Sequence, residues 1–361
     1  MTGGRAHEGR RVAAHQPMKA PAETHMRREI FEIPATVDTL LGKGQAAMTA
    51  AAAALAQRDP PFIISVARGS SDHAATYFEY ASALIAGVPV ASVGPSIASL
   101  YGRRLRLKGA ACLAISQSGK SPDIVSMAAM AQREGALTLA LTNHPESDLA
   151  RVSSCTLALH AGVERSVAAT KTFVASVVAA LWLVAEWRRD AALMAAIRAL
   201  PGVLEQAAAM DWSALGAQVA TRRSLFCLGR GPSLAISNEA ALKFKETCQL
   251  HAESYSSAEV MHGPVSIIDQ GFPVLAFAAA DQAEQAVVNA ADAIAAKGAA
   301  VFATSDKTAR AARLPVVRTA HPLTDPLSLI VSFYAMVEQV AVAQGVDPDA
   351  PRHLTKVTET L

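Results

Sequence analysis

Short apolar runs alternate with longer amphipathic segments over most of this 361-residue chain. The alanine-rich region 26–58 predicts helices, and F-I-I-S-V-A at 62–67 predicts the first buried strand. A helix should follow as far as Gly87, and V-P-V-A-S-V, A-C-L-A-I and A-L-T-L-A-L predict three more strands. The helix between the last two should end at Gly135. Strands that alternate with helices favour a parallel sheet covered by helices on both faces.

This pattern occurs twice along the chain. S-L-F-C-L-G-R-G-P aligns with I-I-S-V-A-R-G-S, so Arg230 follows Arg68 at an offset of 162 residues. P-V-L-A-F aligns with A-C-L-A-I at the same offset, and G-A-A-V-F-A-T-S-D aligns with G-A-L-T-L-A-L-T-N at an offset of 163. We therefore predict an α/β fold of two doubly wound parallel-sheet domains related by internal duplication. The predicted units are a disordered tail (1–25), an N-terminal helical segment (26–44), a first domain (45–190), a helical linker (191–209), a second domain (210–345) and a C-terminal tail (346–361).

The two copies differ where their third strand ends. The first copy ends in S-Q-S-G-K-S (116–121) and the second in A-A-A-D-Q-A (278–283). A loop needed only for folding should occur in both copies, so we expect the serine loop to bind a ligand. Open parallel sheets bind ligands beyond their carboxyl strand ends, and a helix N-terminus with serine hydroxyls suits a phosphate monoester. A plain helix cap would explain Ser121 but not the other serines. Nucleotide binding is disfavoured because the loop lacks G-x-x-x-x-G-K-[ST].

The bulk composition changes this picture little. The net charge is +2 with both signs spread along the chain, which gives no support for nucleic-acid or anionic-membrane binding. The longest apolar stretch, 172–187, is shorter than the roughly 20 residues that span a bilayer, so we expect a buried helix. No secretory signal is evident. We expect a cytoplasmic protein without metal or cofactor, whose separate cysteines are buried free thiols: Cys112, Cys155, Cys227 and Cys248.

Several motifs indicate a family. S-Q-S-G after one strand, with R-G-S-S after an earlier one, resembles the sugar isomerase (SIS) domain. Region 26–361 resembles the tandem-SIS isomerase half of the glutamine:fructose-6-phosphate amidotransferases. The further motifs that match in order are V-A-A-T-K-T-F (167–173), E-A-A-L-K-F-K-E (239–246), H-A-E-S-Y (251–255), H-G-P (262–264) and P-R-H-L-T-K (351–356). The resemblance implies that both predicted domains are SIS domains.

The resemblance also implies catalytic roles. Glu246 would be the base that moves a proton between C1 and C2, which suits a carboxylate if burial raises its pKa toward neutrality. Lys243 would assist by electrostatics, and His262 would open the sugar ring from the neighbouring subunit. Lys356 would form a Schiff base while the C-terminal tail folds over the site. From the residues alone, Glu239, Lys243 and Glu246 could instead form a solvated salt-bridge face.

Substrate contacts follow from the same resemblance. The implied phosphate and sugar contacts are Ser70, Ser71, Ser116, Gln117, Ser118, Ser121, Val167 and Thr355. This chain departs from the family at two positions. Lys120 stands where the synthase usually has glutamate, and Ala169 stands where it has serine, which removes a hydroxyl beside the sugar.

The short N-terminal region bears on the reaction. Only about 45 residues without cysteine precede the first predicted repeat, too few for the family's ammonia-supplying glutaminase domain. We therefore expect a glucosamine-6-phosphate deaminase, because the SIS-type deaminases resemble this chain in length and in lacking the glutaminase domain. We expect it to act as a homodimer with a shared site. The alternatives are a phosphosugar isomerase, a fructosamine-6-phosphate deglycase, or a sugar-phosphate-sensing SIS regulator. A sensor would need the serine loop but not Glu246, His262 and Lys356 together.

Overall fold

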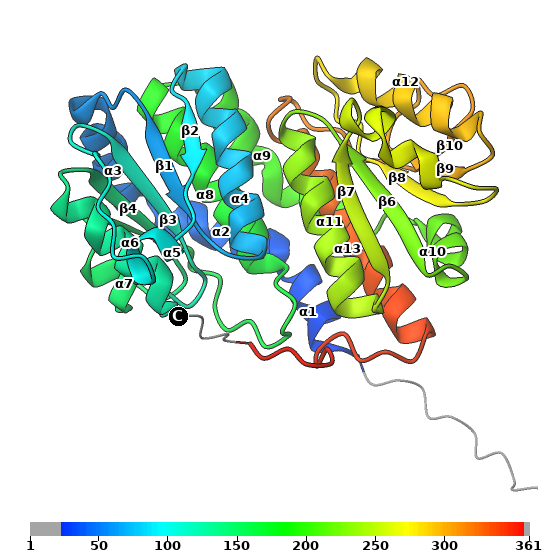
Figure 1. The fold of residues 1–361 in the computed structure, drawn as a ribbon, viewed down its shortest axis with the longest axis horizontal. Helices are drawn as coiled ribbons and strands as arrows, with labels where there is room; N and C mark the ends of the chain where they lie inside the picture. The colour runs from blue at the N-terminus through cyan, green and yellow to red at the C-terminus, as the bar shows by residue number, and fades with distance from the viewer. Residues whose placement is uncertain (1–22, 357–361) are drawn as a thin grey trace, which may run out of the picture.

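The computed structural model describes residues 23–356 of the chain. It places two α/β units side by side, with long helices packed between their sheets (Figure 1). Most of the predicted disordered tail, residues 1–22, and the end of the predicted C-terminal tail, residues 357–361, lie outside the described residues. The remaining unit limits stay predictions.

The first unit contains a five-stranded parallel sheet in the order β2-β1-β3-β4-β5. Its strands are β1 (Ile63–Val66), β2 (Val90–Ser92), β3 (Ala111–Ile115), β4 (Leu137–Thr142) and β5 (Cys155–Ala158). The first four confirm the predicted strands. The sequence did not predict β5, because C-T-L-A is short, half polar and only partly buried.

The second unit repeats this topology. Its strands are β6 (Ser224–Gly229), β7 (His251–Ser256), β8 (Pro273–Ala276), β9 (Ala300–Ala303) and β10 (Ala312–Arg313). Their order, β7-β6-β8-β9-β10, is that of the first sheet when the strands are matched by their sequence offset. The turns after β1 and β6 also share a rare backbone conformation: Gly69 has φ 56° and ψ −134°, and Gly231 has φ 60° and ψ −138°. The predicted internal duplication is confirmed.

Helices cover both faces of each sheet, as the doubly wound prediction requires. In the first unit, Ile63 packs toward α3 (Gln45–Arg58), α4 (Ser70–Ala81) and α8 (Lys171–Arg188), while Ile64 packs toward α6 (Pro122–Arg133). In the second unit, Leu225 packs with α11 (Pro232–Cys248) and α13 (Asp325–Ala343), while Phe226 packs with α12 (Glu284–Ala295). Neighbouring residues of a strand thus face opposite helical layers, because successive side chains of a strand point to opposite faces of the sheet.

One hydrophobic core joins the two units. It takes in α1 (His25–Phe31) and α2 (Ile33–Lys43), the predicted helical region, together with α8, α13 and the predicted linker helix α9 (Ala191–Ala208). The apolar helix α8 is buried along nearly its whole length, as predicted. Among the described residues, α13 is the helix whose length and composition would allow it to cross a membrane, but 83% of it is buried inside the protein as a core helix. The remaining short helices are α5 (Ser96–Ser99), α7 (Asp148–Arg151), α10 (Ser213–Ala220) and η1 to η3 (Ser82–Ala86, Glu259–His262, Pro264–Ile267).

The cysteines follow the prediction with one correction. All four are free thiols, and Cys112, Cys227 and Cys248 are buried. Cys155 is only half-buried, because it begins the edge strand β5.

Candidate active site

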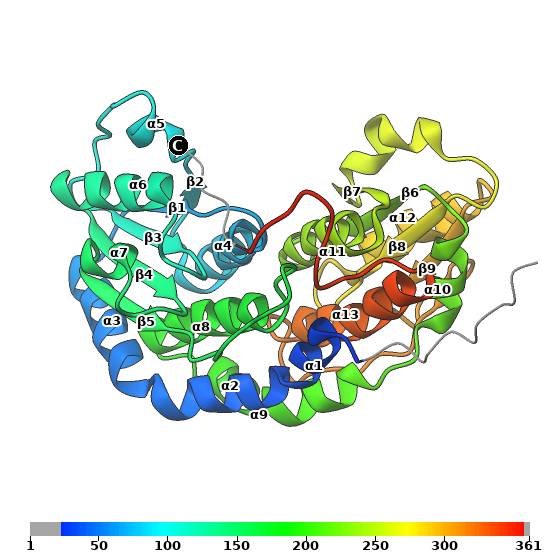
Figure 2. The ribbon, with the colours of Figure 1, turned by 90° about the horizontal axis from the view of Figure 1, so that it is seen from below.

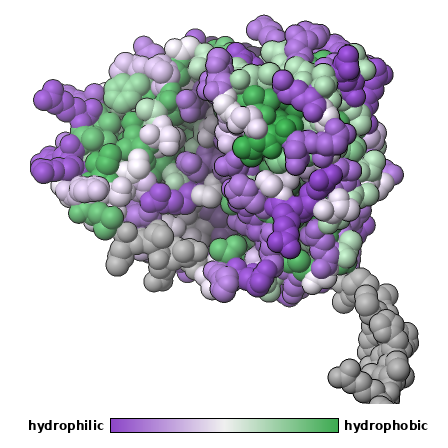
Figure 3. Space-filling view, turned by 45° about the vertical axis from the view of Figure 1, so that its right-hand side comes forward, coloured by the Kyte–Doolittle hydropathy of each residue, from purple (hydrophilic) through white to green (hydrophobic). Residues whose placement is uncertain are grey.

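A pocket of about 280 Å³ lies at the carboxyl ends of β1 and β3, where the first sheet reverses its winding direction. It lies between the two copies, where the molecular surface is hollowed (Figure 3). The loops after β1 and β3, the segment 164–169, α11 and the C-terminal tail all line it. All the predicted substrate contacts line this pocket, together with Glu246 and Lys356: Ser70, Ser71, Ser116, Gln117, Ser118, Ser121, Val167 and Thr355.

The serine loop is a tight turn stabilised by its own hydroxyls. The Ser116 Oγ accepts a hydrogen bond from the Gly119 amide at 3.1 Å, and the Ser118 Oγ accepts one from the Lys120 amide at 3.3 Å. Gly119 has φ 62°, and a Cβ there would lie 2.1 Å from the Oγ of Ser147. Glycine is therefore required both by the backbone angle and by the space.

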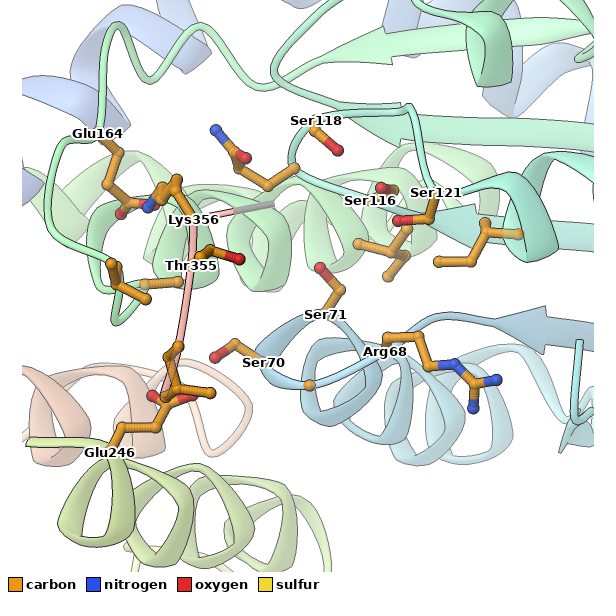
Figure 4. A pocket seen from close by; sticks show the side chains of 17 residues that line it. Arg68, Ser70, Ser71, Ser116, Ser118, Ser121, Glu164, Glu246, Thr355 and Lys356 are labelled. Atoms are coloured by element: carbon orange, nitrogen blue, oxygen red, sulfur yellow. The ribbon is translucent and has the colours of Figure 1, made fainter. Parts of the chain in front are cut away.

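Ser121 occupies the N-cap position of α6 but does not cap it. Among the described residues, its side chain makes no capping hydrogen bond to the helix. Instead Ser121 lines the pocket, close to Ser116 and Ser71 (Figure 4). The helix-cap explanation of Ser121 is therefore wrong, whereas a ligand at the helix N-terminus would use both the hydroxyl and the backbone N–H groups.

Arg68 ties the two ligand-facing loops together. Its guanidinium donates to the Asp123 carboxylate in the first turn of α6 at 2.9 Å. Asp123 is buried, while the Arg68 side chain is about half exposed and reaches the pocket. The sequence marks Arg68 only as part of the Arg-Gly turn, because a lone arginine carries no spacing signal.

The charged face of α11 is buried, not solvated. Glu239 and Lys243 are fully buried, and the Lys243 ammonium pairs with the Glu239 carboxylate at 3.4 Å and with Glu246. Lys243 also donates to the Ser70 hydroxyl at 3.1 Å. The solvated salt-bridge alternative is therefore wrong, and this helix face meets the first copy beside the pocket.

Three more groups complete the shell around Glu239. Its carboxylate accepts hydrogen bonds from the Ser70 hydroxyl at 3.1 Å and from the Tyr334 hydroxyl at 3.0 Å. The Nδ1 atom of His73 lies 2.9 Å from its other oxygen. Glu239 therefore joins α4 of the first copy to α11 and α13 of the second.

These contacts set the charge states of the pair. Burial alone would raise the pKa of Glu239, but Lys243 and His73 beside it outweigh burial and lower that pKa below its usual 4.5. Burial disfavours the charged ammonium of Lys243, yet the carboxylates of Glu239 and Glu246 raise its pKa above the usual 10.5. Both residues are therefore ionised in the folded protein at neutral pH.

Glu246 faces the pocket from the second copy. Its side chain is 19% exposed, and it lies across the pocket from Ser118 and Ser121 (Figure 4). Lys243 lies one turn earlier, behind Ser70, and contacts Glu246 without being part of the pocket lining. A carboxylate in this position can exchange a proton with a bound ligand, and the lysine can stabilise negative charge that develops there.

The C-terminal tail lies over the pocket. It crosses from α13 to the first copy (Figure 2), where the Val167 amide donates to the Asp349 carbonyl at 3.3 Å. At its end, the Lys356 ammonium donates to the Glu164 carboxylate at 3.0 Å and to the Ser166 carbonyl at 2.5 Å. The described part of the tail therefore contributes Leu354, Thr355 and Lys356 to the pocket lining.

Glu164 is a pocket residue that the sequence did not predict. It is buried, and it accepts hydrogen bonds from the Thr170 and Thr172 amides at the start of α8. Its carboxylate therefore fixes the N-terminus of α8 and also positions Lys356. No periodicity or motif around V-E-R-S-V marks it, because its partners lie in two other segments of the chain.

Two predicted site residues do not line the pocket of the described chain: Lys243, which lies beside it, and His262. His262 is exposed at the end of η2. Its contribution from a neighbouring subunit stays a prediction.

The SIS domain family model matches residues 58–186 and 218–343, one match in each copy. The chain belongs to the SIS domain family. Two curated relatives are glutamine–fructose-6-phosphate aminotransferases [isomerizing]. The enzyme of Sulfurisphaera tokodaii is 32% identical over 81% of this chain and 49% of its own length, and that of Pyrobaculum aerophilum is 32% identical over 92% and 56%. This SIS protein thus spans about half the length of these relatives.

Solved structures share the tandem fold. A crystal structure from Silicibacter pomeroyi DSS-3, described as a candidate phosphosugar isomerase, is 60% identical and covers 91% of this chain and 100% of its own, with a TM-score of 0.88. The C-terminal domain of a glucosamine-fructose-6-phosphate aminotransferase from Francisella tularensis has a TM-score of 0.80 at 24% identity, covering 93% and 100%. A glucosamine-6-phosphate deaminase from Thermotoga maritima has a TM-score of 0.76 at 18% identity, covering 93% and 100%. The last two are similar in fold alone.

Proposed function

We propose that this SIS protein is a glucosamine-6-phosphate deaminase, which converts glucosamine 6-phosphate and water into fructose 6-phosphate and ammonia. One observation carries the proposal: the serine loop, the Glu246 carboxylate and the Lys356 ammonium line a single pocket. An anion-binding loop holds one end of a phosphorylated sugar, and the carboxylate and ammonium then face its other end.

The serine loop would hold the phosphate. Hydroxyls of Ser116, Ser118 and Ser121 line the pocket at the N-terminus of α6, where unpaired N–H groups and the helix dipole favour an anion. Ser70 and Ser71 would contact the phosphate or sugar from the turn after β1. Gln117, Val167 and Thr355 would contact the sugar.

The chemistry would run through Glu246. After ring opening, Glu246 removes the proton from C2 and returns it to C1, which leaves an imine at C2. Water adds to C2, the C2–N bond breaks, and ammonia leaves with the proton that the added water releases. Lys243 stabilises the negative charge of the intermediate. Lys356 would form a Schiff base with the C2 ketone of the fructose 6-phosphate product, with loss of water, and hydrolysis of that C2–N bond would return the free lysine and the product. His262 would open the ring from a neighbouring subunit, so the proposed active form is a homodimer.

The names of similar proteins support the substrate class. A relative at 60% identity is described as a candidate phosphosugar isomerase, and the names of the curated relatives include fructose 6-phosphate. That phosphosugar isomerase description favours a second candidate function, aldose–ketose isomerisation of a sugar phosphate without loss of nitrogen. The same proton transfer by Glu246 would serve both reactions.

Ammonia release tests the proposal. Purified protein with glucosamine 6-phosphate should release ammonia and form fructose 6-phosphate without added metal or nucleotide. Parallel assays with glucose 6-phosphate and other aldose phosphates test the second candidate. Ketose formation there without ammonia release from glucosamine 6-phosphate would favour the isomerase, and no turnover of either substrate class would reject both.

A further inference from the structure

Glu164 and Lys356 form an ion pair in the lining of the substrate pocket. The Lys356 ammonium donates to the Oε2 atom of Glu164 at 3.0 Å and to the Ser166 carbonyl at 2.5 Å. Both partners are acceptors, so together they suit a nitrogen that carries hydrogens and positive charge. We call these two acceptors, the Glu164 carboxylate and the Ser166 carbonyl, the cation cradle. Within residues 23–356, Lys356 is the cation that pairs with Glu164.

The cation cradle is fixed in place. The Glu164 side chain is fully buried. Its Oε1 atom accepts hydrogen bonds from the Thr170 and Thr172 amides at 3.0 and 3.1 Å, and its Oε2 atom accepts one from the Thr172 hydroxyl at 2.6 Å. The Ser166 amide donates to the buried Glu29 carboxylate at 3.2 Å. Neither acceptor can therefore move without breaking buried hydrogen bonds, which is costly.

Lys356, in contrast, lies on a segment that can move. The preceding residues 352–355 are exposed, and its own side chain is 27% exposed. Segments with few buried contacts open at a low cost in free energy. A buried carboxylate that loses its partner is left as an uncompensated charge, which is strongly unfavourable. We therefore expect Lys356 to leave the cradle when another cation takes its place.

The cradle lies at the reacting end of the pocket. Glu164 and Lys356 lie at one side of it, and Ser116 and Ser121 of the proposed phosphate site lie at the other (Figure 4). In the proposed reaction, the substrate carries its nitrogen on C2, and the Lys356 nitrogen later joins the same carbon. The two nitrogens therefore need the same place at different times.

We propose that the cation cradle binds the amino group of the substrate, and that Lys356 occupies this place in the empty protein. The proposal rests on the proposed function and deepens it, because it makes Glu164 the residue that distinguishes an amino sugar phosphate from its hydroxyl counterpart. An ammonium on C2 brings three donors and a positive charge to the buried carboxylate, whereas a hydroxyl brings one donor and no charge. A hydroxyl does not replace the charge of Lys356.

Two matched probes test the cradle. Both are open-chain alcohols made by reduction: one from glucosamine 6-phosphate, with an amino group on C2, and the other from glucose 6-phosphate, with a hydroxyl there. Neither has a carbonyl, so neither can be turned over or form a Schiff base. Calorimetry at pH 7, where aliphatic amines are largely protonated, gives their dissociation constants. The wild-type protein should bind the amino probe about tenfold more tightly, and equal affinity would overturn the proposal.

Two substitutions should move this preference in opposite directions. Glu164→Gln keeps the shape of the side chain and removes its charge, so the preference should disappear. Lys356→Met removes the competing ammonium, so the amino probe should gain affinity and the preference should widen by about a further tenfold. A preference that survives Glu164→Gln, or that is unchanged or smaller in Lys356→Met, would overturn the proposal.

Asp190→Asn and Lys297→Met are the matched controls. Asp190 caps α9 and Lys297 is an exposed lysine after α12, and both lie away from the pocket lining. Neither should change the preference, and a change as large as in the test variants would overturn the assignment to the cradle. Melting curves report folding, and Lys356→Met decides the matter if Glu164→Gln does not fold. Because the readout is binding, a protein with these preferences that releases no ammonia would reject the proposed function and not this inference.

Discussion

The Lys243 ammonium, from the second copy, donates a hydrogen bond of 3.1 Å to the hydroxyl of Ser70 in the first. Ser70 begins α4 directly after the Arg-Gly turn, and Lys243 lies on the corresponding helix of the duplicate, α11. The duplicated helices therefore pack against each other at the pocket. One copy supplies the serine loop, and the other supplies Glu246.

Ser121 should matter for binding rather than for stability. Ser121→Ala is expected to raise the KM for glucosamine 6-phosphate about tenfold or more, since a hydrogen bond to a charged group is lost. Its free energy of unfolding should change by less than about 0.5 kcal/mol, because no helix cap is removed. Steady-state kinetics and urea unfolding measure the two effects.

Asp190→Ala is the matched control. Asp190 caps α9 through the Leu193 amide at 2.9 Å, away from the pocket lining. It should lose about 1 kcal/mol of stability with an unchanged KM. If Ser121→Ala instead behaved like this control, Ser121 would be a helix cap after all.

Glu239 should stabilise the fold in a pH-dependent way. Its folded pKa lies below its usual 4.5, so its ionised form contributes stability above that pH, and this is lost as the pH falls through the lowered pKa. Glu239→Gln should therefore cost about 3–5 kcal/mol at pH 7, because it leaves the buried Lys243 short of a partner. The difference from wild type should shrink as the pH falls below 4.5.

Urea unfolding at several pH values measures this difference. Glu205→Gln, on the exposed side of α9, removes the same charge without a buried partner and should stay within about 0.5 kcal/mol of wild type. A pH-independent cost in Glu239→Gln would mean that the loss comes from packing and not from the ion pair.

Lys356 should be the residue that carries the open sugar. Borohydride reduction in the presence of fructose 6-phosphate is expected to leave a hexose phosphate on Lys356, which peptide mass spectrometry locates. Lys356→Arg should give no adduct, because a guanidinium does not form a Schiff base. An adduct on Lys243 instead would contradict the assignment, and it is not expected since that ammonium is fully buried between two carboxylates.

The fold could be predicted well from the sequence because the same order of strands and turns occurs twice along the chain. The strands at 63–66 and 111–115 are buried on both faces and stand out as apolar runs, and the shared Arg-Gly turn fixed the offset between the copies. Strands β5, β7 and β10 were missed, because edge strands with polar or exposed residues carry little pattern.

The site was predicted where residues cluster in a motif. The serine loop and the Glu239–Glu246 helix face were found this way, and the structure brings the serine loop and Glu246 to one pocket. Glu164 and Arg68 were not predicted as pocket residues, since each is brought there by long-range contacts that no local spacing records. The burial of Lys243 also could not be predicted, because i, i+4 charges usually lie on a solvated face.

The central claim is that Glu246 moves a proton on a sugar whose phosphate the serine loop holds. Turnover of glucosamine 6-phosphate deuterated at C2 tests it most directly, measured for the wild type and for Glu246→Gln alongside Glu205→Gln. We predict that ammonia release by the wild type and by Glu205→Gln is slower with the deuterated substrate than with the ordinary one, and that Glu246→Gln binds the substrate but releases no ammonia. Full ammonia release by a folded Glu246→Gln, with the same isotope effect as wild type, would contradict the account.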